Sequence, residues 1–433
     1  MKSALKILLC MVLVLATVLT FIGCDSSNNS NNDNPPPEEP GPAPTGTLSY
    51  KLNEDEKSYT VSGIGTYEGN RLIIPETYEG LPVTVIGKNA FQGCKNFVSV
   101  TIPNSVRRIE YRAFYECTGL KNLTIPDGVT SIKVEAFSKC TSLVSVTIGK
   151  NVTEIKDAAF RYCYRLIEVY NLSSLDLLSV ESCGIGYIAY YTLDIYNTAD
   201  APSKIVTDEN GFRFYADDTR CYLVGYMGSA TDLTLPATYN GREYGIYKYA
   251  FYDCSISSVV IPDTVKILDD YAFESCDNLK SVTIGNGIET IGNYAFSDCV
   301  ALTDIKFGSN VKVFGSYAFE GCIELGGDSK GEFVIPNTVT TIGAYAFYGC
   351  SSMKYVTIPL SVKDIGHDVF YNSDLRRAYY CGTEADWEEV DMSSENSKLN
   401  SVRFYYYSET QPPVKGNYWY YDNNGKVAFW KFN

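Results

Sequence analysis

Apolar and polar residues recur along this chain in a fixed order over 23 positions, and we call this repeating pattern the phrase. The phrase occurs twice in succession between Val106 and Asn151, each time as Val-x-x-Ile, then Ala-Phe, Cys and Leu, and then a closing apolar-Thr-Ile. Its Phe recurs ten times, at Phe91, Phe114, Phe137, Phe160, Phe251, Phe273, Phe296, Phe319, Phe347 and Phe370. A fixed period of this length is typical of solenoids, in which each repeat forms one turn, or rung.

The spacing within the phrase predicts two kinds of element, with positions counted from Val106 as position 1. Ala, Phe, Cys and Leu at positions 8, 9, 12 and 15 share one face of a short helical turn. Apolar positions 18 and 20 alternate with polar positions 17 and 19, which is the pattern of a short strand with one buried face. One rung cannot bury these residues alone, so rungs must stack. We expect an α/β solenoid of about ten 23-residue rungs, with short strands on one face, short helical turns on the other and β-hairpin caps.

The repeats stop and start again, so they form two arrays. Leu233–Gly241 repeats the pattern of Leu72–Gly80, and each of these segments directly precedes an array. A solenoid needs a cap where its first rung has no neighbour. The predicted organisation is a signal peptide 1–23, a disordered tether 24–47, an N-terminal cap 48–82, a first array 83–171, an interruption with a second cap 172–241, a second array 242–375 and a C-terminal cap 376–433.

The N-terminus has the features of a targeting segment. Lys2 and Lys6 precede the apolar run Ile7–Ile22, which is short for a membrane span and suits a signal peptide. The run closes on Phe-Ile-Gly-Cys24, which resembles the lipobox of bacterial lipoproteins. The resemblance implies that Cys24 is lipidated and that several acyl chains attach the protein to a membrane. The alternative is an ordinary signal peptide cut near Gly23.

Charge and reactive residues exclude several functions. The net charge of −15 argues against nucleic acid as a partner, because neutralising phosphates needs clustered Lys and Arg. His367 is the single histidine, too few for a catalytic triad or a common zinc site. Nine cysteines occupy position 12: Cys94, Cys117, Cys140, Cys163, Cys254, Cys276, Cys299, Cys322 and Cys350. Stacked rungs hold equivalent Cβ atoms about 4.8 Å apart, wider than a disulfide needs. We interpret these cysteines as small buried residues and expect no catalytic residue, cofactor or metal.

Two surface stripes are candidate binding sites. Positions 17 and 19 form the outer face of the predicted strands, with Thr101, Thr124, Thr147, Thr283, Lys306, Tyr355 and Thr357. Solenoids commonly bind partners on such a face. A solvated face with paired threonines is the alternative.

The second stripe is a tyrosine edge at position 7 of the second array, made of Tyr249, Tyr271, Tyr294, Tyr317 and Tyr345. The first array has Asn89, Arg112, Glu135 and Ala158 at this position. Rigid amphipathic rings suit protein or glycan binding. The alternative is ring stacking that only stabilises the rungs.

The complete phrase Ile-Gly-x-x-Ala-Phe-x-x-Cys-x-x-Leu-x-x-Val-x-Ile-Pro is clearest at Ile86–Pro103 and Ile342–Pro359. It resembles the BspA-like (Treponema-type) leucine-rich repeats over residues 48–433. The last rung departs from it, with Ser373 for Cys and Val369 for Ala, as expected of an end rung.

The resemblance implies a leucine-rich-repeat superhelix and a membrane-anchored lipoprotein at the bacterial cell surface. It also implies a non-enzymatic adhesin or protein–protein interaction module that binds partners on host or neighbouring cells. A glycan-binding protein that uses the tyrosine edge is the second hypothesis. An enzyme within residues 172–241 is the third.

Overall fold

The computed structural model describes residues 45–178, 185–327, 331–422 and 427–431. The predicted signal peptide, most of the tether and the lipidation site Cys24 lie outside this part of the chain, as does Cys183. Residues 41–433 form one compact unit. No helix among the described residues has the length and apolar character that crossing a membrane requires.

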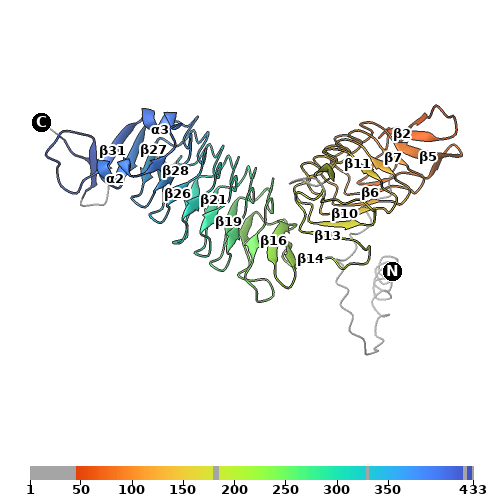
Figure 1. The fold of residues 1–433 in the computed structure, drawn as a ribbon, viewed down its shortest axis with the longest axis horizontal. Coiled ribbons are helices and arrows are strands. Elements are labelled where there is room, and N and C mark those ends of the chain that lie inside the picture. The colour runs from red at the N-terminus through yellow and green to blue at the C-terminus, as the bar shows by residue number, and fades with distance from the viewer. Residues whose placement is uncertain (1–44, 179–184, 328–330, 423–426, 432–433) are drawn as a thin grey trace, which may run out of the picture. The chain divides into compact units, whose positions relative to one another are not determined.

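Positions 17–20 form the predicted strands, and these strands stack in parallel (Figure 1). We call this set the main ladder. It contains β3 (Arg71–Ile73), β6 (Ser99–Thr101), β8 (Asn122–Ile125), β10 (Ser145–Ile148), β12 (Glu168–Asn171) and β13 (Asp194–Tyr196), then β17 (Asp232–Thr234), β19 (Ser258–Val260), β21 (Ser281–Thr283), β23 (Asp304–Lys306), β25 (Glu332–Val334), β27 (Tyr355–Ile358), β29 (Arg377–Tyr380), β31 (Arg403–Tyr407) and β32 (Tyr418–Tyr421). Equivalent positions pair, as Val146 does with Leu123 and with Val169. The stacked parallel strands are therefore as predicted.

The Val-x-x-Ile segments form a second ladder of parallel strands, most of them two residues long. It contains β5 (Leu81–Ile86), β7 (Arg108–Ile109), β9 (Ser131–Ile132) and β11 (Glu154–Ile155), then β18 (Gly245–Ile246), β20 (Ile267–Leu268), β22 (Thr290–Ile291), β24 (Val313–Phe314), β26 (Thr341–Ile342), β28 (Asp364–Ile365) and β30 (Asp391–Met392). Each of the ten repeats thus contributes one strand to each ladder, and the core lies between the two ladders.

Antiparallel hairpins occur beside the repeats. The first pairs β1 (Ser49–Leu52) with β2 (Tyr59–Gly63), the second is built from β14 (Ile205–Thr207), β15 (Phe212–Ala216) and β16 (Cys221–Tyr226), and the last pairs β32 with β33 (Val427–Phe429). The short β4 (Thr77–Tyr78) turns back on β5. The helices among the described residues are η1 (Ile185–Tyr187), α2 (Glu384–Glu388) and α3 (Ser397–Ser401). Thr383 and Asp386 form a capping box at α2.

The prediction of short helical turns is wrong. Positions 6–15 form consecutive tight turns, and the described helices lie outside the ten repeats. Residues at positions 7 and 11 adopt a left-handed backbone conformation. Examples are Tyr294 at position 7 and Asp298 at position 11, each with φ of 55°. The Phe114 N–H donates to the carbonyl of Ala136 in the next rung at 2.8 Å. Because these residues break the helical backbone and the N–H groups bond between rungs, no helical turn forms, yet positions 8, 9, 12 and 15 still face inward.

The estimate of about ten rungs is also low. In the described residues the main ladder has fifteen strands, because segments that we assigned to caps and to the interruption continue it. Strands β3, β13, β17, β29, β31 and β32 all pair in parallel with a neighbour. The segments of β3, β13, β17, β31 and β32 lack the Ala-Phe…Cys pattern of the phrase, so the count of phenylalanines did not include them, whereas β29 ends the rung of Phe370.

The core is a set of columns that run along the rungs. Phe114 and Phe137 stack at 5.1 Å between ring centroids with 5° between their planes, and Phe273 and Phe296 at 5.3 Å and 11°. Seven of the nine position-12 cysteines are fully buried, as predicted. Each of these seven thiols donates to the carbonyl of the Phe one rung earlier, at 3.1–3.3 Å; Cys299 to Phe273 is an example. Position 12 therefore holds a small side chain that also satisfies a buried carbonyl.

Candidate binding surfaces

The outer face of the main ladder is a flat polar surface in the first array. Ser99, Thr101, Asn122 and Thr124 are exposed, and the Ser145 hydroxyl donates to Asn122 Oδ1 at 2.9 Å. Thr147 is half-buried in the same face. The side chains on the other side of these strands belong to the core, so the outer side chains are not needed to bury apolar surface.

The same face of the second array is less uniform. Thr283 is half-buried and Lys306 is exposed, while Val260 and Val334 are 40% and 56% exposed. Two exposed valines among polar side chains give this stretch an apolar component that the first array lacks. We call β6, β8 and β10 the first window of the face, and β17, β19, β21, β23 and β25 the second window.

The face is covered toward the C-terminus, which corrects our expectation for Thr357. That residue is only 4% exposed, and Tyr355 is half-buried. Tyr379 pairs beside Thr357 on the neighbouring strand, and Tyr379, Tyr405 and Trp419 form an aromatic cluster on this side of the sheet. The hairpin of β32 and β33 supplies part of that cluster, so Thr357 belongs to an interior.

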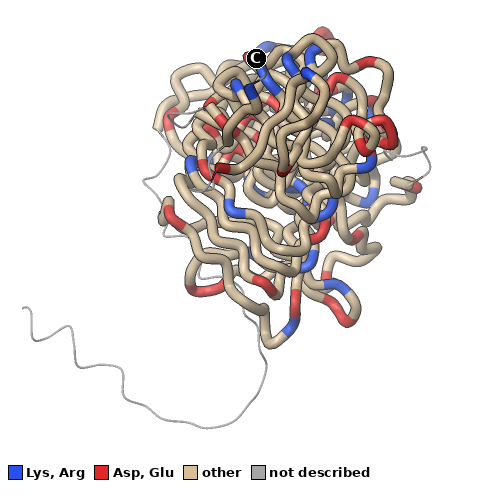
Figure 2. The backbone as a smooth tube through the Cα atoms, turned by 90° about the vertical axis from the view of Figure 1, so that its left-hand side faces the viewer, with Lys and Arg blue, Asp and Glu red and all other residues tan. Residues whose placement is uncertain are grey.

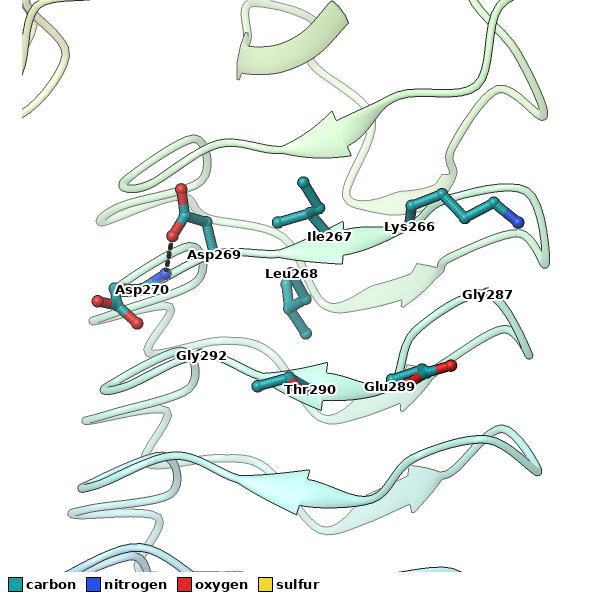
Figure 3. Close-up of a pocket in the computed structure, with 9 residues that line it drawn as sticks. All are labelled: Lys266, Ile267, Leu268, Asp269, Asp270, Gly287, Glu289, Thr290 and Gly292. Atoms are coloured by element: carbon teal, nitrogen blue, oxygen red, sulfur yellow. Dashed lines mark hydrogen bonds between the residues drawn. The ribbon is translucent and has the colours of Figure 1, made fainter. Parts of the chain in front are cut away.

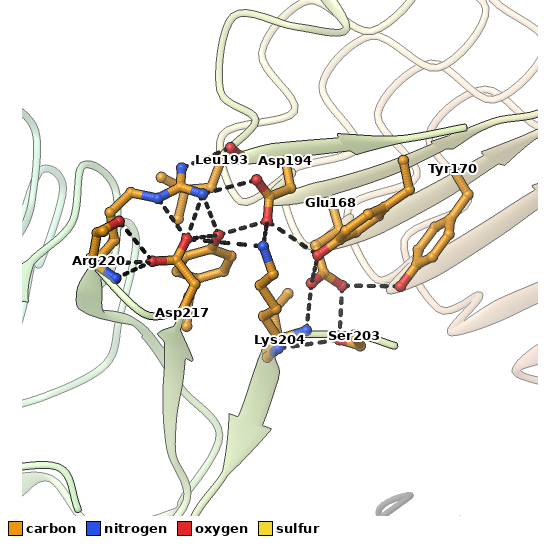
Figure 4. A network of polar contacts seen from close by, with 12 residues as sticks. Glu168, Tyr170, Leu193, Asp194, Ser203, Lys204, Asp217 and Arg220 are labelled. Carbon is orange, nitrogen blue, oxygen red and sulfur yellow. Dashed lines mark hydrogen bonds and ion pairs between the residues drawn. The ribbon is translucent and has the colours of Figure 1, made fainter. Parts of the chain in front are cut away.

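The end of the first array is covered too, by a polar network (Figure 4). Glu168 occupies position 17 but is 1% exposed, because Ser203 Oγ and the Lys204 N–H both donate to its carboxylate at 2.7 Å. Tyr170 and Tyr196 donate to it as well, at 3.3 and 3.1 Å. The interruption thus folds back on the last strands of the first array.

Asp194 links this network to the second cap. Lys204 Nζ donates to it at 2.7 Å, Tyr215 Oη at 2.6 Å and the Arg220 guanidinium at 2.9 Å. Arg220 also pairs with Asp217 at 2.6 Å. Burial alone raises the pKa of the Asp194 carboxyl, but the hydrogen bonds from Lys204, Tyr215 and Arg220 outweigh it and lower the pKa to about 2. Asp194 is therefore ionised over the physiological pH range and ties the two arrays together.

The tyrosine edge is a column of stacked rings. Neighbouring centroids lie 4.5–4.7 Å apart with planes within 22° of parallel, from Tyr249 through Tyr345. Tyr164 extends the column at one end, at 4.4 Å from Tyr249, and the His367 ring closes it edge-on at 4.5 Å from Tyr345. Tyr249 is buried and the other four tyrosines are half-buried. Each ring face is covered by the next ring, so the edge offers ring rims and hydroxyl groups to a ligand.

A shallow pocket of about 490 Å³ lies on the second ladder between β20 and β22 (Figure 3). Lys266, Asp269, Asp270 and Glu289 contribute its charged groups. Burial raises the pKa of the Asp269 carboxyl, and Asp269 accepts a hydrogen bond from the Asp270 N–H at 2.9 Å. No histidine or cysteine is among the residues that line this pocket.

The described residues contain no group of three or more His, Cys, Asp and Glu side chains placed to hold a metal ion. His367 packs against a tyrosine at the end of a ring column. Residues 185–241 of the interruption consist of η1, short strands and the hairpin of the second cap. Acidic and basic residues are interspersed over the backbone (Figure 2).

Comparison with known proteins identifies a family that has these repeats. The family described as "BspA type Leucine rich repeat region" matches in six copies over residues 72–188, 244–375 and 329–409, which is more than half of the chain. No curated protein matches.

Several solved structures are similar to this chain. A leucine rich cell surface protein from Faecalibacterium prausnitzii A2-165 is 24% identical over 82% of this chain and 100% of that chain, with a TM-score of 0.39. A leucine-rich repeat protein from Bacteroides ovatus ATCC 8483 is 22% identical over 84% and 98%, with a TM-score of 0.34. The T. pallidum Leucine Rich Repeat protein is 22% identical over 64% and 87%, with a TM-score of 0.23.

Proposed function

The chain belongs to the BspA-type leucine-rich-repeat family, and on that premise we propose that it is a non-enzymatic binding protein of the bacterial cell surface whose partners are proteins. The observation that carries this proposal is the bare outer face of the main ladder. In its two windows the outward residues are exposed or half-buried and are mostly small and polar. An adhesive role, with partners on host or neighbouring cells, follows from the same surface.

Rigidity makes this face suitable for binding. Its strands are hydrogen-bonded to neighbours in register, for example β10 to both β8 and β12. Ser and Thr side chains lose little rotamer freedom when a partner covers them. Docking of a partner on this face therefore costs little side-chain entropy, so more of the contact energy remains as binding free energy.

Bulky charge on the face should abolish binding without unfolding the protein. We expect Thr124→Arg in the first window and Thr283→Arg in the second to weaken binding to a protein ligand about ten-fold or more, because each places a long charged side chain in the contact. The ligand is selected from a panel of purified extracellular matrix proteins with the 41–433 fragment, and affinity is measured by biolayer interferometry.

The matched control is Thr290→Arg, an exposed threonine on β22 in the second ladder. It should bind as the parent does and unfold at the same temperature as the two face variants. Equal binding by all three variants, or no binding to any member of the panel, would contradict the proposal.

Glycan binding at the tyrosine edge is the second candidate, supported by the row of half-buried rings with their hydroxyl groups. Because ring faces are covered, a sugar would be held by hydrogen bonds to the hydroxyls. A glycan array run in parallel separates the two candidates. Binding that is lost in Tyr294→Phe, which keeps the ring stack and removes a hydroxyl, would favour the glycan hypothesis.

Attachment to the membrane through Cys24 is part of the proposal. Export with a lipidated N-terminal cysteine gives stable anchoring, since several acyl chains act together. We expect cells fed an alkyne-tagged fatty acid to label the full-length chain, and Cys24→Ser to remove the label and release the protein from the membrane fraction. A labelled Cys24→Ser protein, or an unlabelled parent, would refute lipidation at this residue.

A further inference from the structure

A cleft of about 470 Å³ lies where the first array meets the first repeat of the second array. Most of its lining residues stand at positions 11 and 13 of successive rungs of the first array, and Tyr252 and Asp253 line it from the second array. The volume falls within the range of about 300–1,000 Å³ that ligand pockets span. The cleft contains no residue of the outer strand face and none of the five residues of the tyrosine edge.

Contacts between the two arrays hold the cleft in shape. The Arg165 guanidinium donates to the carbonyl of Tyr252 at 2.6 Å, and the Tyr164 ring stacks on Tyr249 at 4.4 Å between ring centroids. Tyr164 and Tyr252 are adjacent as well, with ring centroids 4.5 Å apart. Because side chains join the two sides of the cleft, a ligand meets a site that is already formed, which lowers the cost of binding.

Three tyrosine rings line the cleft. The planes of Tyr162 and Tyr164 are 60° apart, and those of Tyr164 and Tyr252 are 51° apart. All three residues are half-buried. Rings at such angles do not cover one another as the parallel rings of the tyrosine edge do, so they leave apolar ring surface to the cleft. The faces of aromatic rings are electron-rich and suit contact with the C–H groups of a sugar ring.

Two threonine hydroxyls also line the cleft. Thr118 and Thr141 both stand at position 13, in consecutive rungs, and both are half-buried. Neither hydroxyl has a hydrogen-bond partner among the described residues. Equivalent positions of stacked rungs are about 4.8 Å apart. Since a hydroxyl both donates and accepts, the pair can bind two hydroxyl groups of one ligand.

The charges that line the cleft are balanced. Lys95 and Lys139 face Glu116 and Asp253, two of each sign, and Lys139 Nζ donates to Glu116 at 2.9 Å. An ammonium group has three donors and a carboxylate has several lone pairs, so this pair keeps capacity for a ligand.

This balance selects the chemistry of the ligand. An anionic or cationic ligand would meet as many like charges as opposite ones. An apolar ligand would cover the charged groups without giving them hydrogen bonds, which costs free energy. A neutral ligand with many hydroxyl groups can donate to the carboxylates and accept from the lysines.

We propose that the cleft binds a neutral oligosaccharide, with Thr118 and Thr141 bonding to sugar hydroxyls and the tyrosine rings packing against sugar C–H groups. The site differs from the strand face in both its residues and its ligand, and it differs from the tyrosine edge in its residues. The inference therefore goes beyond the proposed function, and each of the three sites can fail separately.

Isothermal titration calorimetry of residues 41–433, which form one compact unit, tests the proposal. The probes are the neutral sugars maltotriose, cellotriose, xylotriose and triacetylchitotriose, with trigalacturonate as an acidic sugar and trilysine as a basic peptide. We expect at least one neutral sugar to bind, and the two charged probes to bind about ten-fold more weakly or less. No binding of any neutral sugar, or equal binding of a charged probe, would overturn the proposal.

A double variant locates the site. Thr118→Val with Thr141→Val removes both hydroxyls with little change in volume, so the dissociation constant of the bound sugar should rise about ten-fold or more. Position 13 carries Lys95 and Tyr164 in the neighbouring rungs, so it accepts different side chains, and the variant should unfold at the parent's temperature. The parent's affinity in this folded variant would overturn the proposal.

The matched control is Thr130→Val with Thr153→Val, the same chemical change at two exposed threonines of the first array that lie outside the cleft. It should bind the sugar as the parent does. Thr124→Arg on the strand face and Tyr294→Phe on the tyrosine edge should also leave the affinity unchanged. Weaker binding in any of these controls would place the sugar outside the cleft and overturn the proposal.

Discussion

Replacing Phe296 by alanine should lower the free energy of unfolding by about 3–5 kcal/mol. The ring is fully buried and stacks on Phe273 at 5.3 Å and on Phe319 at 5.7 Å. A rung contacts its two neighbours only, so the cavity weakens both interfaces and distant parts of the solenoid cannot compensate. Urea denaturation of the 41–433 fragment, followed by far-UV circular dichroism, measures the loss.

Cys299→Ala, in the same rung, is the matched control. It removes one sulfur atom and the hydrogen bond of 3.1 Å to the Phe273 carbonyl. We expect a cost of about 1–2 kcal/mol, because the volume lost is small and one buried carbonyl loses its second donor. If Phe296→Ala cost no more than Cys299→Ala, the phenylalanine column would not be the main source of rung-to-rung stability.

The second large effect is expected at the junction of the arrays, where Asp194→Ala should separate one unfolding transition into two. Asp194 accepts from Lys204, Tyr215 and Arg220, and its side chain is 17% exposed. Its removal leaves these donors short of an acceptor, at a cost of about 1–3 kcal/mol. In a solenoid such a loss falls on one interface, so the two arrays unfold more independently. Differential scanning calorimetry measures the separation.

The same residue gives the stability a defined acid dependence. The folded pKa of Asp194 is lowered to about 2 from an ordinary value of 3.8. The stabilisation is therefore fully present above about pH 4 and is lost as the pH falls toward 2. Asp194→Ala should remove this contribution, while Asp200→Ala, at an exposed carboxylate nearby, should change neither the pH profile nor the calorimetric trace. A single transition in Asp194→Ala would show that the arrays are held together by other contacts.

The candidate surfaces were partly visible in the sequence. The position of the tyrosine edge could be predicted, because an identical residue at the same place in five rungs must form a row. The sequence did not show whether the rings present their faces to solvent or to one another. That depends on the spacing of 4.5–4.7 Å between ring centroids, which leaves no room for a ligand between neighbouring rings. Thr357 and Glu168 satisfy the outward pattern of their strands, but segments distant in sequence cover them.

The sequence by itself determined the solenoid, the inward positions of the rung and the strands of the main ladder. It did so because each residue of a rung contacts the same position in the next rung, so that a period in the chain becomes a column in space. The tertiary structure decided the features that depend on contacts between rungs or on segments that fold back over the strands. Non-glycine residues such as Arg112 and Tyr294 adopt left-handed conformations that residue type disfavours. They do so because hydrogen bonds to the next rung fix the backbone there, and that information lies in the stacking and not in any single repeat.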